Sequence, residues 1–193
     1  MANSYTPEEQ TILLDLARQT LTAITHHRPP PDIDLNALPL PLRDERACFV
    51  TLRFHADGAL RGCTGTLVAR RPLAEEVVHM TGQTAFHDPR FAPVTAHEVP
   101  LLHIEISVLT PPQLLDFRDA DDLLQKLRPN IDGVTLELNN RRATFLPQVW
   151  ENYPDPRVFL SLLSQKMRLG PDAWQDPHMQ VSVYQAIIIE EPT

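Results

Sequence analysis

The chain has 193 residues, enough for one domain with a substantial hydrophobic core. Its 25 acidic residues outnumber 17 Lys and Arg, giving a formal net charge of -8. A protein that grips nucleic-acid phosphates is normally basic, so this balance argues against nucleic acid as a partner. No stretch approaches the ~20 apolar residues of a membrane helix, and the first residues, Met1-Ala2-Asn3-Ser4-Tyr5, lack the features of a secretory signal. We therefore expect a cytoplasmic protein that uses neither nucleic acid nor membrane.

The cysteine content and the missing motifs limit the cofactors. Cys48 and Cys63 are the two cysteines, and no C-x-x-C occurs. The sequence therefore indicates neither a disulfide framework nor a zinc site. It also contains neither G-x-G-x-x-G nor G-x-x-x-x-G-K-[ST], the two glycine motifs that hold nucleotide phosphates. We predict no metal and no cofactor.

The N-terminal part predicts a helix followed by an extended arm. Thr6 can cap the helix, Pro7 suits its first position and Glu9 completes a capping box, so we place the helix at about 7–26. Residues 28–47 hold five prolines, which favour extended backbone over regular structure. Leucines and an isoleucine are interspersed there, so we read the segment as an arm lying on the domain surface. Residues 1–193 then form a single domain, with its core at 48–191.

The sequence pattern next predicts two strands, at about 48–54 and 60–67, which pair as a hairpin. The second strand has a glycine on either side of Cys63. Two registers remain open. A two-residue turn at Asp57-Gly58 places Cys63 opposite Leu52, whereas a loop that includes Ala56 places Cys63 opposite Thr51 on the other face. In the first register Cys48 lies roughly 13 Å along the strand from Cys63. A disulfide allows ~4.4–6.8 Å between Cα atoms, so we predict no bridge.

The remaining pattern predicts helices at 72–86, 119–127 and 155–169, strands at 101–110 and 181–190, and a hairpin that pairs 133–138 with 141–146. We expect the strand at 181–190 to lie centrally in its sheet, because Ile187-Ile188-Ile189 shows no alternation. Strands arrive as hairpins separated by helices. The predicted class is α+β, with a largely antiparallel central sheet flanked by helices.

Cys63 is the candidate nucleophile. A catalytic cysteine needs a nearby base or cationic group and donors for a developing oxyanion. Arg61 lies two residues before Cys63, glycine amides flank it, and His87 and Glu105 lie on segments that can fold back over the hairpin. We therefore name Cys63, His87 and Glu105 as candidate catalytic residues. The competing interpretation is a buried cysteine that acts as a small hydrophobe.

Three short motifs, in this order and at these separations, resemble the AMMECR-type domain, also called AmmeMemoRadiSam system protein A: Leu60-Arg61-Gly62-Cys63-Thr64-Gly65, Asp88-Pro89-Arg90-Phe91 and Leu146-Pro147-Gln148-Val149-Trp150. The similarity runs from about Ala47 to Glu191. Thr64 departs from the family pattern, which has an apolar residue at that position, and it can make the site more polar.

The resemblance implies an α+β fold with the arginine-glycine-cysteine segment beside a cleft. It also implies a setting with two partner proteins, a Memo-like protein and a radical S-adenosylmethionine (SAM) enzyme. From the three motifs we take as candidate ligand-binding residues Arg61, Gly62, Thr64, Gly65, Asp88, Arg90 and Gln148.

Two functions follow from these residues, and the sequence does not choose between them. In the first, Cys63 acts on a small substrate while Arg61 or Arg90 holds its anionic group. In the second, the glycine segment and the loop from Asp88 to Arg90 bind a partner protein without chemistry. Both require Asp88 and Arg90 to lie near Cys63, and the rigid Pro89 between them favours this.

Overall fold

The computed structural model describes residues 5–192, and the chain divides into two compact units. Unit 1 is formed by Met1–Leu109 together with Ile187–Thr193, and unit 2 by Thr110–Ala186. The α+β class and the antiparallel pairing of strands are confirmed, with the strands shared between two four-stranded sheets. Within residues 5–192, no helix combines the length and the apolar character needed to cross a membrane.

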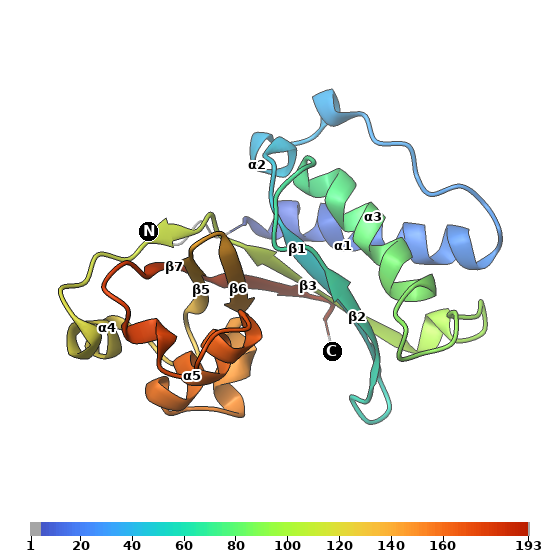
Figure 1. Cartoon of the computed structure of the whole chain (residues 1–193). Helices are drawn as coiled ribbons and strands as arrows, with labels where there is room; N and C mark the ends of the chain where they lie inside the picture. The colour runs from blue at the N-terminus through green and yellow to red at the C-terminus, as the bar shows by residue number, and fades with distance from the viewer. Residues whose placement is uncertain (1–4, 193) are drawn as a thin grey trace. The chain divides into compact units, whose positions relative to one another are not determined.

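Unit 1 is a sheet in the order β2-β1-β3-β8, packed against two long helices (Figure 1). The predicted first helix is present and has the expected capping box: Thr6 Oγ1 accepts from the Glu9 N–H, and Glu9 Oε2 accepts from the Thr6 N–H. The elements are α1 (Pro7–Thr25), η1 (Leu35–Ala37), α2 (Leu40–Arg43), β1 (Cys48–Phe54), β2 (Leu60–Gly65), α3 (Leu73–Phe86), η2 (Val99–Leu101), β3 (Leu102–Leu109) and β8 (Ala186–Glu190).

The two faces of this sheet differ in chemistry because side chains alternate along each strand. On one face, α1 and α3 cover a fully buried apolar layer that includes Val50, Leu52, Ile104 and Ile106. On the other face, β1 and β3 place polar residues, among them Thr51 and Glu105. The core of unit 1 therefore lies between the sheet and the helices.

The proline-rich arm contains more structure than its composition predicts. Pro39 and Pro41 occupy the cap and first turn of the short helix α2, where a missing N–H costs nothing. Leu42 of this helix is fully buried in the core of unit 1. The arm thus lies against the unit, as expected, but its backbone is partly helical.

Unit 2 has a second sheet, in the order β4-β7-β5-β6, with its own core. The predicted hairpin of β5 and β6 is present, and Asn139 and Asn140 in its turn have the positive φ values, 50° and 62°, that this tight connection requires. The core includes Trp150, whose ring stacks on Phe159 with centroids 3.6 Å apart. The elements are β4 (Gln113–Leu114), α4 (Ala120–Lys126), β5 (Gly133–Leu138), β6 (Arg141–Phe145), η3 (Pro147–Glu151), α5 (Pro156–Lys166), η4 (Ala173–Gln175) and β7 (Gln180–Tyr184).

The prediction of one central strand at 181–190 is wrong. The segment forms two strands, β7 in the sheet of unit 2 and β8 at the edge of the sheet of unit 1. Ile188 is 46% exposed while Ile189 is fully buried, so the strand does alternate between faces. The three consecutive isoleucines do not reveal this alternation, because a sequence pattern reports the polarity of a side chain and not whether it is buried.

Two glycines of β2 are required by close packing. A Cβ on Gly65 would lie 2.3 Å from Cγ of Phe49 and 2.5 Å from the carbonyl oxygen of Cys48, while one on Gly62 would lie 3.0 Å from the carbonyl oxygen of Thr84 in α3. Gly82, in the middle of α3, has no atom within 4 Å of the equivalent position. Glycine is thus needed for space in β2 and not in α3.

We predict opposite effects of alanine at these positions. Gly65→Ala should lower the free energy of unfolding by about 1–3 kcal/mol, because the new methyl group overlaps a ring and a backbone oxygen. Gly82→Ala should raise it by about 0.5–1 kcal/mol, since alanine favours a helix and meets open space. Urea unfolding of both variants measures the two changes. Equal effects would contradict the packing described for Gly65.

Candidate functional site

The register of the first hairpin determines where the Cys63 thiol lies. The structure pairs Thr51 with Cys63, which is the second of the two registers left open by the sequence. A bulge at this point of the hairpin leaves Arg61 of β2 without a register partner, because Leu52 pairs with Gly62 and Arg53 with Leu60. The side chain of Cys63 therefore shares a face with Thr51 and not with Val50. It lies on the face opposite the helix-covered core.

Cys63, Thr51 and Glu105 form a row across β2, β1 and β3, because Thr51 is the register partner of both other residues. We call these three residues, with Ser107, the polar face. The hydroxyl of Thr51 donates to Sγ of Cys63 at 3.3 Å, and that of Ser107 donates to Oε1 of Glu105 at 3.3 Å. Glu105 is two strands from Cys63, or about 10 Å, so it lies in the row without touching the sulfur.

Cys48 provides a contrast within the same hairpin. It is fully buried on the core face, and burial, reinforced by the negative charge of Glu76, raises the pKa of its thiol. Thr66, and not Leu67, lies beside it, since the Thr66 N–H donates to the Cys48 carbonyl at 3.0 Å. Because Cys48 and Cys63 point to opposite faces, both remain free thiols, as predicted.

The prediction that Asp88 and Arg90 lie near Cys63 is confirmed. The Cys63 N–H donates to Oδ2 of Asp88 at 2.9 Å, and Nη2 of Arg90 donates to the Cys63 carbonyl at 3.0 Å. The two side chains also pair with each other at 2.7 Å. The hydrogen bond from Arg90 holds the pKa of the buried Asp88 carboxyl well below its usual range. Both polar groups of the Cys63 peptide are thereby occupied, so its N–H is not a free oxyanion donor.

Arg61 fixes a neighbouring loop. Its Nε donates to Oε1 of Glu98 at 2.7 Å, its Nη2 donates to the carbonyl of Ala92 at 3.0 Å, and its guanidinium lies 5.9 Å from the ring centroid of Phe91. The hydrogen bond from Arg61 lowers the pKa of Glu98 to about 2. The guanidinium of Arg61 is already paired with the Glu98 carboxylate, and its side chain is only 10% exposed. Arg61 therefore stabilises the position of this loop.

Thr64 points away from Cys63 toward the helices. Its hydroxyl lies 2.7 Å from that of Thr84 in α3, and Thr84 in turn donates to the carbonyl of Val50. The structure thus joins Thr64 to α3 on the core side of the sheet. Gly62 and Gly65 allow close packing within the same strand.

Two of the predicted site residues, His87 and Gln148, make no hydrogen bond to Cys63 among those described. His87 is exposed at the C-terminal cap of α3, where it lines a groove of about 500 Å³ with Ile24 and His79. Gln148 is exposed in η3, within unit 2. Among residues 5–192, no group of three or more His, Cys, Asp or Glu side chains is arranged to hold a metal ion.

Thr51 and Ser107 are the two members of the polar face that the sequence did not single out. Each is an ordinary strand residue with no motif around it. Their place follows from the register alone, so a correct choice between the two hairpin registers would have identified Thr51.

We predict that the Arg61 contact makes part of the stability of the protein pH-dependent. The pKa of Glu98 falls from its usual 4.5 to about 2 on folding. The contribution of the ionised Glu98 to the free energy of unfolding is therefore fully present above about pH 4.5, and it is lost as the pH falls toward 2. The Glu98→Gln variant should be less stable than the unmodified protein at neutral pH, and the difference should shrink through this interval. Urea unfolding across the pH range measures it, and a constant difference would contradict the contact.

The chain is similar to known proteins over most of its length. The AMMECR1 family model matches residues 14–189. Protein MJ0810 of Methanocaldococcus jannaschii is 33% identical over 187 residues, covering 96% of this chain and 92% of that protein. Protein MK0488 of Methanopyrus kandleri is 34% identical over 194 residues, with 99% and 92% covered.

A solved structure shares the fold. The crystal structure of protein PH0010 from Pyrococcus horikoshii matches with a TM-score of 0.79 and 31% identity, covering 96% of this chain and 93% of that one. The three motifs in the sequence resemble the same family. Because the family model and the relatives at 33% and 34% identity span most of its length, the chain belongs to the AMMECR1 family.

Proposed function

We propose that the protein binds a small anionic ligand beside the thiol of Cys63, on the polar face of unit 1. The observation that carries the proposal is the position of Sγ. It lies on the face away from the apolar core, is only partly buried, and accepts a hydrogen bond from Thr51. A cysteine kept only for packing would lie in the core, as Cys48 does.

The other residues of the motif have structural partners that account for them. Gly62 and Gly65 provide space, Arg61 anchors a loop, and Thr64 joins α3. The thiol of Cys63 makes no comparable contribution to the fold. A hydroxyl that donates to sulfur fixes the orientation of the cysteine side chain, which suits a sulfur that meets a ligand.

Arg90 supplies the charge that favours an anion. It uses Nε and Nη2 for Asp88 and for the carbonyl of Cys63, and its side chain is 53% exposed. Nη1 can therefore meet a carboxylate or phosphate without breaking the existing contacts. Nη1 of Arg61 also has no hydrogen-bond partner among the described residues, but this atom is buried together with the rest of the guanidinium, so a ligand at the surface cannot reach it. Of the two arginines that the sequence offers for an anionic group, Arg61 and Arg90, we therefore assign this role to Arg90.

The structure favours thiol-dependent binding over acid–base catalysis as the basis of the function. Among the described residues, the hydrogen bonds to Sγ come from Thr51, with no histidine contributing. Glu105 lies too far along the row to take a proton directly. A catalytic cycle would need a base supplied by the ligand or by a partner protein.

The family resemblance supports a Memo-like protein and a radical SAM enzyme as partners. We extend the proposal to these two, as proteins that deliver or receive the ligand. Co-purification with the tagged chain tests this extension. An association that Cys63→Ser leaves intact, together with no ligand effect at the thiol, would support the alternative of a non-catalytic adaptor.

We predict that Cys63 is alkylated in the native protein, and that Arg90 selects for anionic reagents. Iodoacetate and iodoacetamide differ in charge but deliver similar groups, so the ratio of their rates at Cys63 reports the local charge. Arg90→Gln should lower that ratio by about threefold or more, whereas Arg90→Lys, which keeps the charge, should largely preserve it. Peptide mass spectrometry with each reagent gives the rates.

Cys48 is the internal control. It should remain unmodified, and Cys63→Ser should abolish native labelling, whereas Cys48→Ala should leave it unchanged. Cys63→Ala should change the free energy of unfolding by less than about 1 kcal/mol, because the thiol is not part of the core. An unreactive Cys63, or a Cys63→Ala variant as unstable as a core deletion, would overturn the proposal.

A further inference from the structure

A groove on unit 1 lies between α1, α3 and the proline-rich arm, and it is the groove that His87 lines. Figure 1 shows α1 and α3 side by side, with the arm continuing from the end of α1. The volume of about 500 Å³ accommodates a small organic molecule. We call it the helix groove, and its lining includes Ile24, Pro30, His79, Gly82, Gln83 and Phe86.

Gly82 lies in this groove at a position where the fold gains nothing from glycine. In the interior of a helix, glycine is less favourable than alanine, because it loses more backbone freedom on folding. No atom lies within 4 Å of the place that a Cβ on Gly82 would take, so the methyl group of an alanine would project into the groove. Gly62 and Gly65, by contrast, make room for neighbours within the chain. The space above Gly82 therefore suits a molecule from outside the chain that approaches the helix backbone closely.

The groove also has polar side chains that the fold does not use. The carboxylate of Glu75, the ring of His79 and the amide of Gln83 make no hydrogen bond among the described residues. The three residues follow one another at intervals of four along α3, so they lie on one face of the helix. A ligand in the groove can thus meet three unpaired polar groups in a row.

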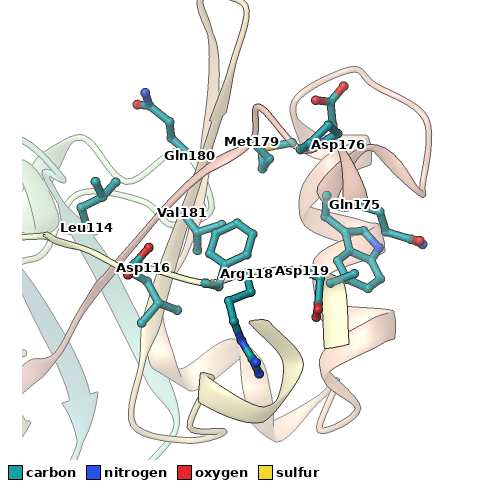
Figure 2. Close-up of a pocket in the computed structure, with 14 residues that line it drawn as sticks. Leu114, Asp116, Arg118, Asp119, Gln175, Asp176, Met179, Gln180 and Val181 are labelled. Carbon is teal, nitrogen blue, oxygen red and sulfur yellow. The ribbon is translucent and has the colours of Figure 1, made fainter. Parts of the chain in front are cut away.

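The cleft of unit 2 differs in this respect. Figure 2 shows Arg118, Asp119 and Asp176 beside that cleft, and each has a partner in the chain. Arg118 donates to the carboxylate of Asp122, and Asp119 accepts from the Asp122 N–H. Asp176 accepts from the His178 N–H. These charged groups stabilise the fold of unit 2, whereas the polar groups of the helix groove remain available to a ligand.

One end of the helix groove suits a flat heterocyclic base. Gln83 presents an amide donor and an amide acceptor together, the pair that recognises the edge of an adenine. Phe86 and Pro30 supply apolar surface beside it. Without a Cβ on Gly82, a flat ring can lie directly against the helix backbone. This combination favours a purine over a branched aliphatic group.

The other end of the groove suits hydroxyl groups and disfavours phosphate. Glu75 lies eight residues before Gln83, or about 12 Å along the helix axis, a span that a nucleoside can bridge. A carboxylate is the group that accepts from ribose hydroxyls in many nucleotide sites. Asp32 adds a second negative charge, and the guanidinium of Arg71 already donates to Glu76 at 3.1 Å. A phosphate would meet repulsion here without a free cation to offset it.

We propose that the helix groove binds adenosine, a purine nucleoside without phosphate. The base would lie against the backbone at Gly82 with its edge hydrogen-bonded to Gln83, and the ribose hydroxyls would donate to Glu75. This site is independent of the function proposed for Cys63.

NMR titration of the whole ¹⁵N-labelled chain tests the proposal, because it gives both the affinity and the place of binding. Adenosine should shift the backbone amide signal of Gly82 with a Kd of about 1 mM or lower. AMP, which adds a phosphate, and 2′,3′-dideoxyadenosine, which lacks the ribose hydroxyls, should each bind about tenfold more weakly. Phenethylamine, which has an aromatic ring and a positive charge but no base edge, should leave the signal nearly unshifted.

Two pairs of variants separate binding from folding. Gly82→Ala should weaken adenosine binding about tenfold or more although it stabilises the helix, so misfolding cannot explain the loss. Gly170→Ala is its matched control, because a Cβ on Gly170 also meets open space but lies outside the groove. Gln83→Leu should weaken binding about tenfold, whereas Gln19→Leu, on an exposed residue of α1 that does not line the groove, should leave it unchanged.

Four results would overturn the proposal. The first is an unshifted Gly82 signal at about 5 mM adenosine, a concentration at which a ligand of millimolar affinity is largely bound. The second is AMP binding as tightly as adenosine. The third is binding of phenethylamine in place of adenosine, which would identify an amine site. The fourth is equal adenosine affinity in Gly82→Ala and Gly170→Ala.

Discussion

The hydrogen bonds that Asp88 and Arg90 make to the peptide of Cys63 are the constraint on which the candidate site depends. They join the segment after α3 to the middle of β2, so this segment and the strand cannot shift relative to each other without breaking both hydrogen bonds. Such charge-assisted bonds are stronger than neutral ones and fix direction as well as distance. The sulfur is therefore held by a backbone that is rigid on both sides of it.

This constraint works together with the strict alternation of the sheet. The register places Cys63 and Cys48 on opposite faces, so one hairpin carries a packed thiol and a partly exposed one. The bulge after Leu52 is what makes the difference, because a shift of one residue would exchange the faces. Gly65 then leaves room for Phe49 on the face where Cys63 lies.

The sequence predicted those features that depend on local interactions. The capping residues Thr6, Pro7 and Glu9 identified α1 to within one residue at each end, and Asn139-Asn140 identified a hairpin turn. The approach of Asp88 to Cys63 followed from the family resemblance and the rigid Pro89. The register could not be chosen, because the loop at 55–59 accepts either turn with a similar local cost.

Features that depend on contacts between distant parts of the chain could not be predicted from the sequence. The place of Thr51 follows from a bulge, and the separation of β7 from β8 follows from pairing with two different sheets. The versatile chemistry of histidine makes His87 a candidate in the sequence, but the orientation of the end of α3 decides what its ring can reach. Polarity patterns report which residues are apolar, and they do not report which strand lies next to which.

The return of the chain to unit 1 after unit 2 has a consequence for the order of folding. Unit 1 includes β8, which follows all of unit 2 in the chain, and Glu191 just beyond it accepts from both the side chain of Arg18 and the backbone N–H of Ile104. During synthesis the whole of unit 2 leaves the ribosome before these partners of α1 and β3 are available. Until then, β3 has an unpaired edge, which is open to wrong partners. The unit that begins first is thus the one that is completed last.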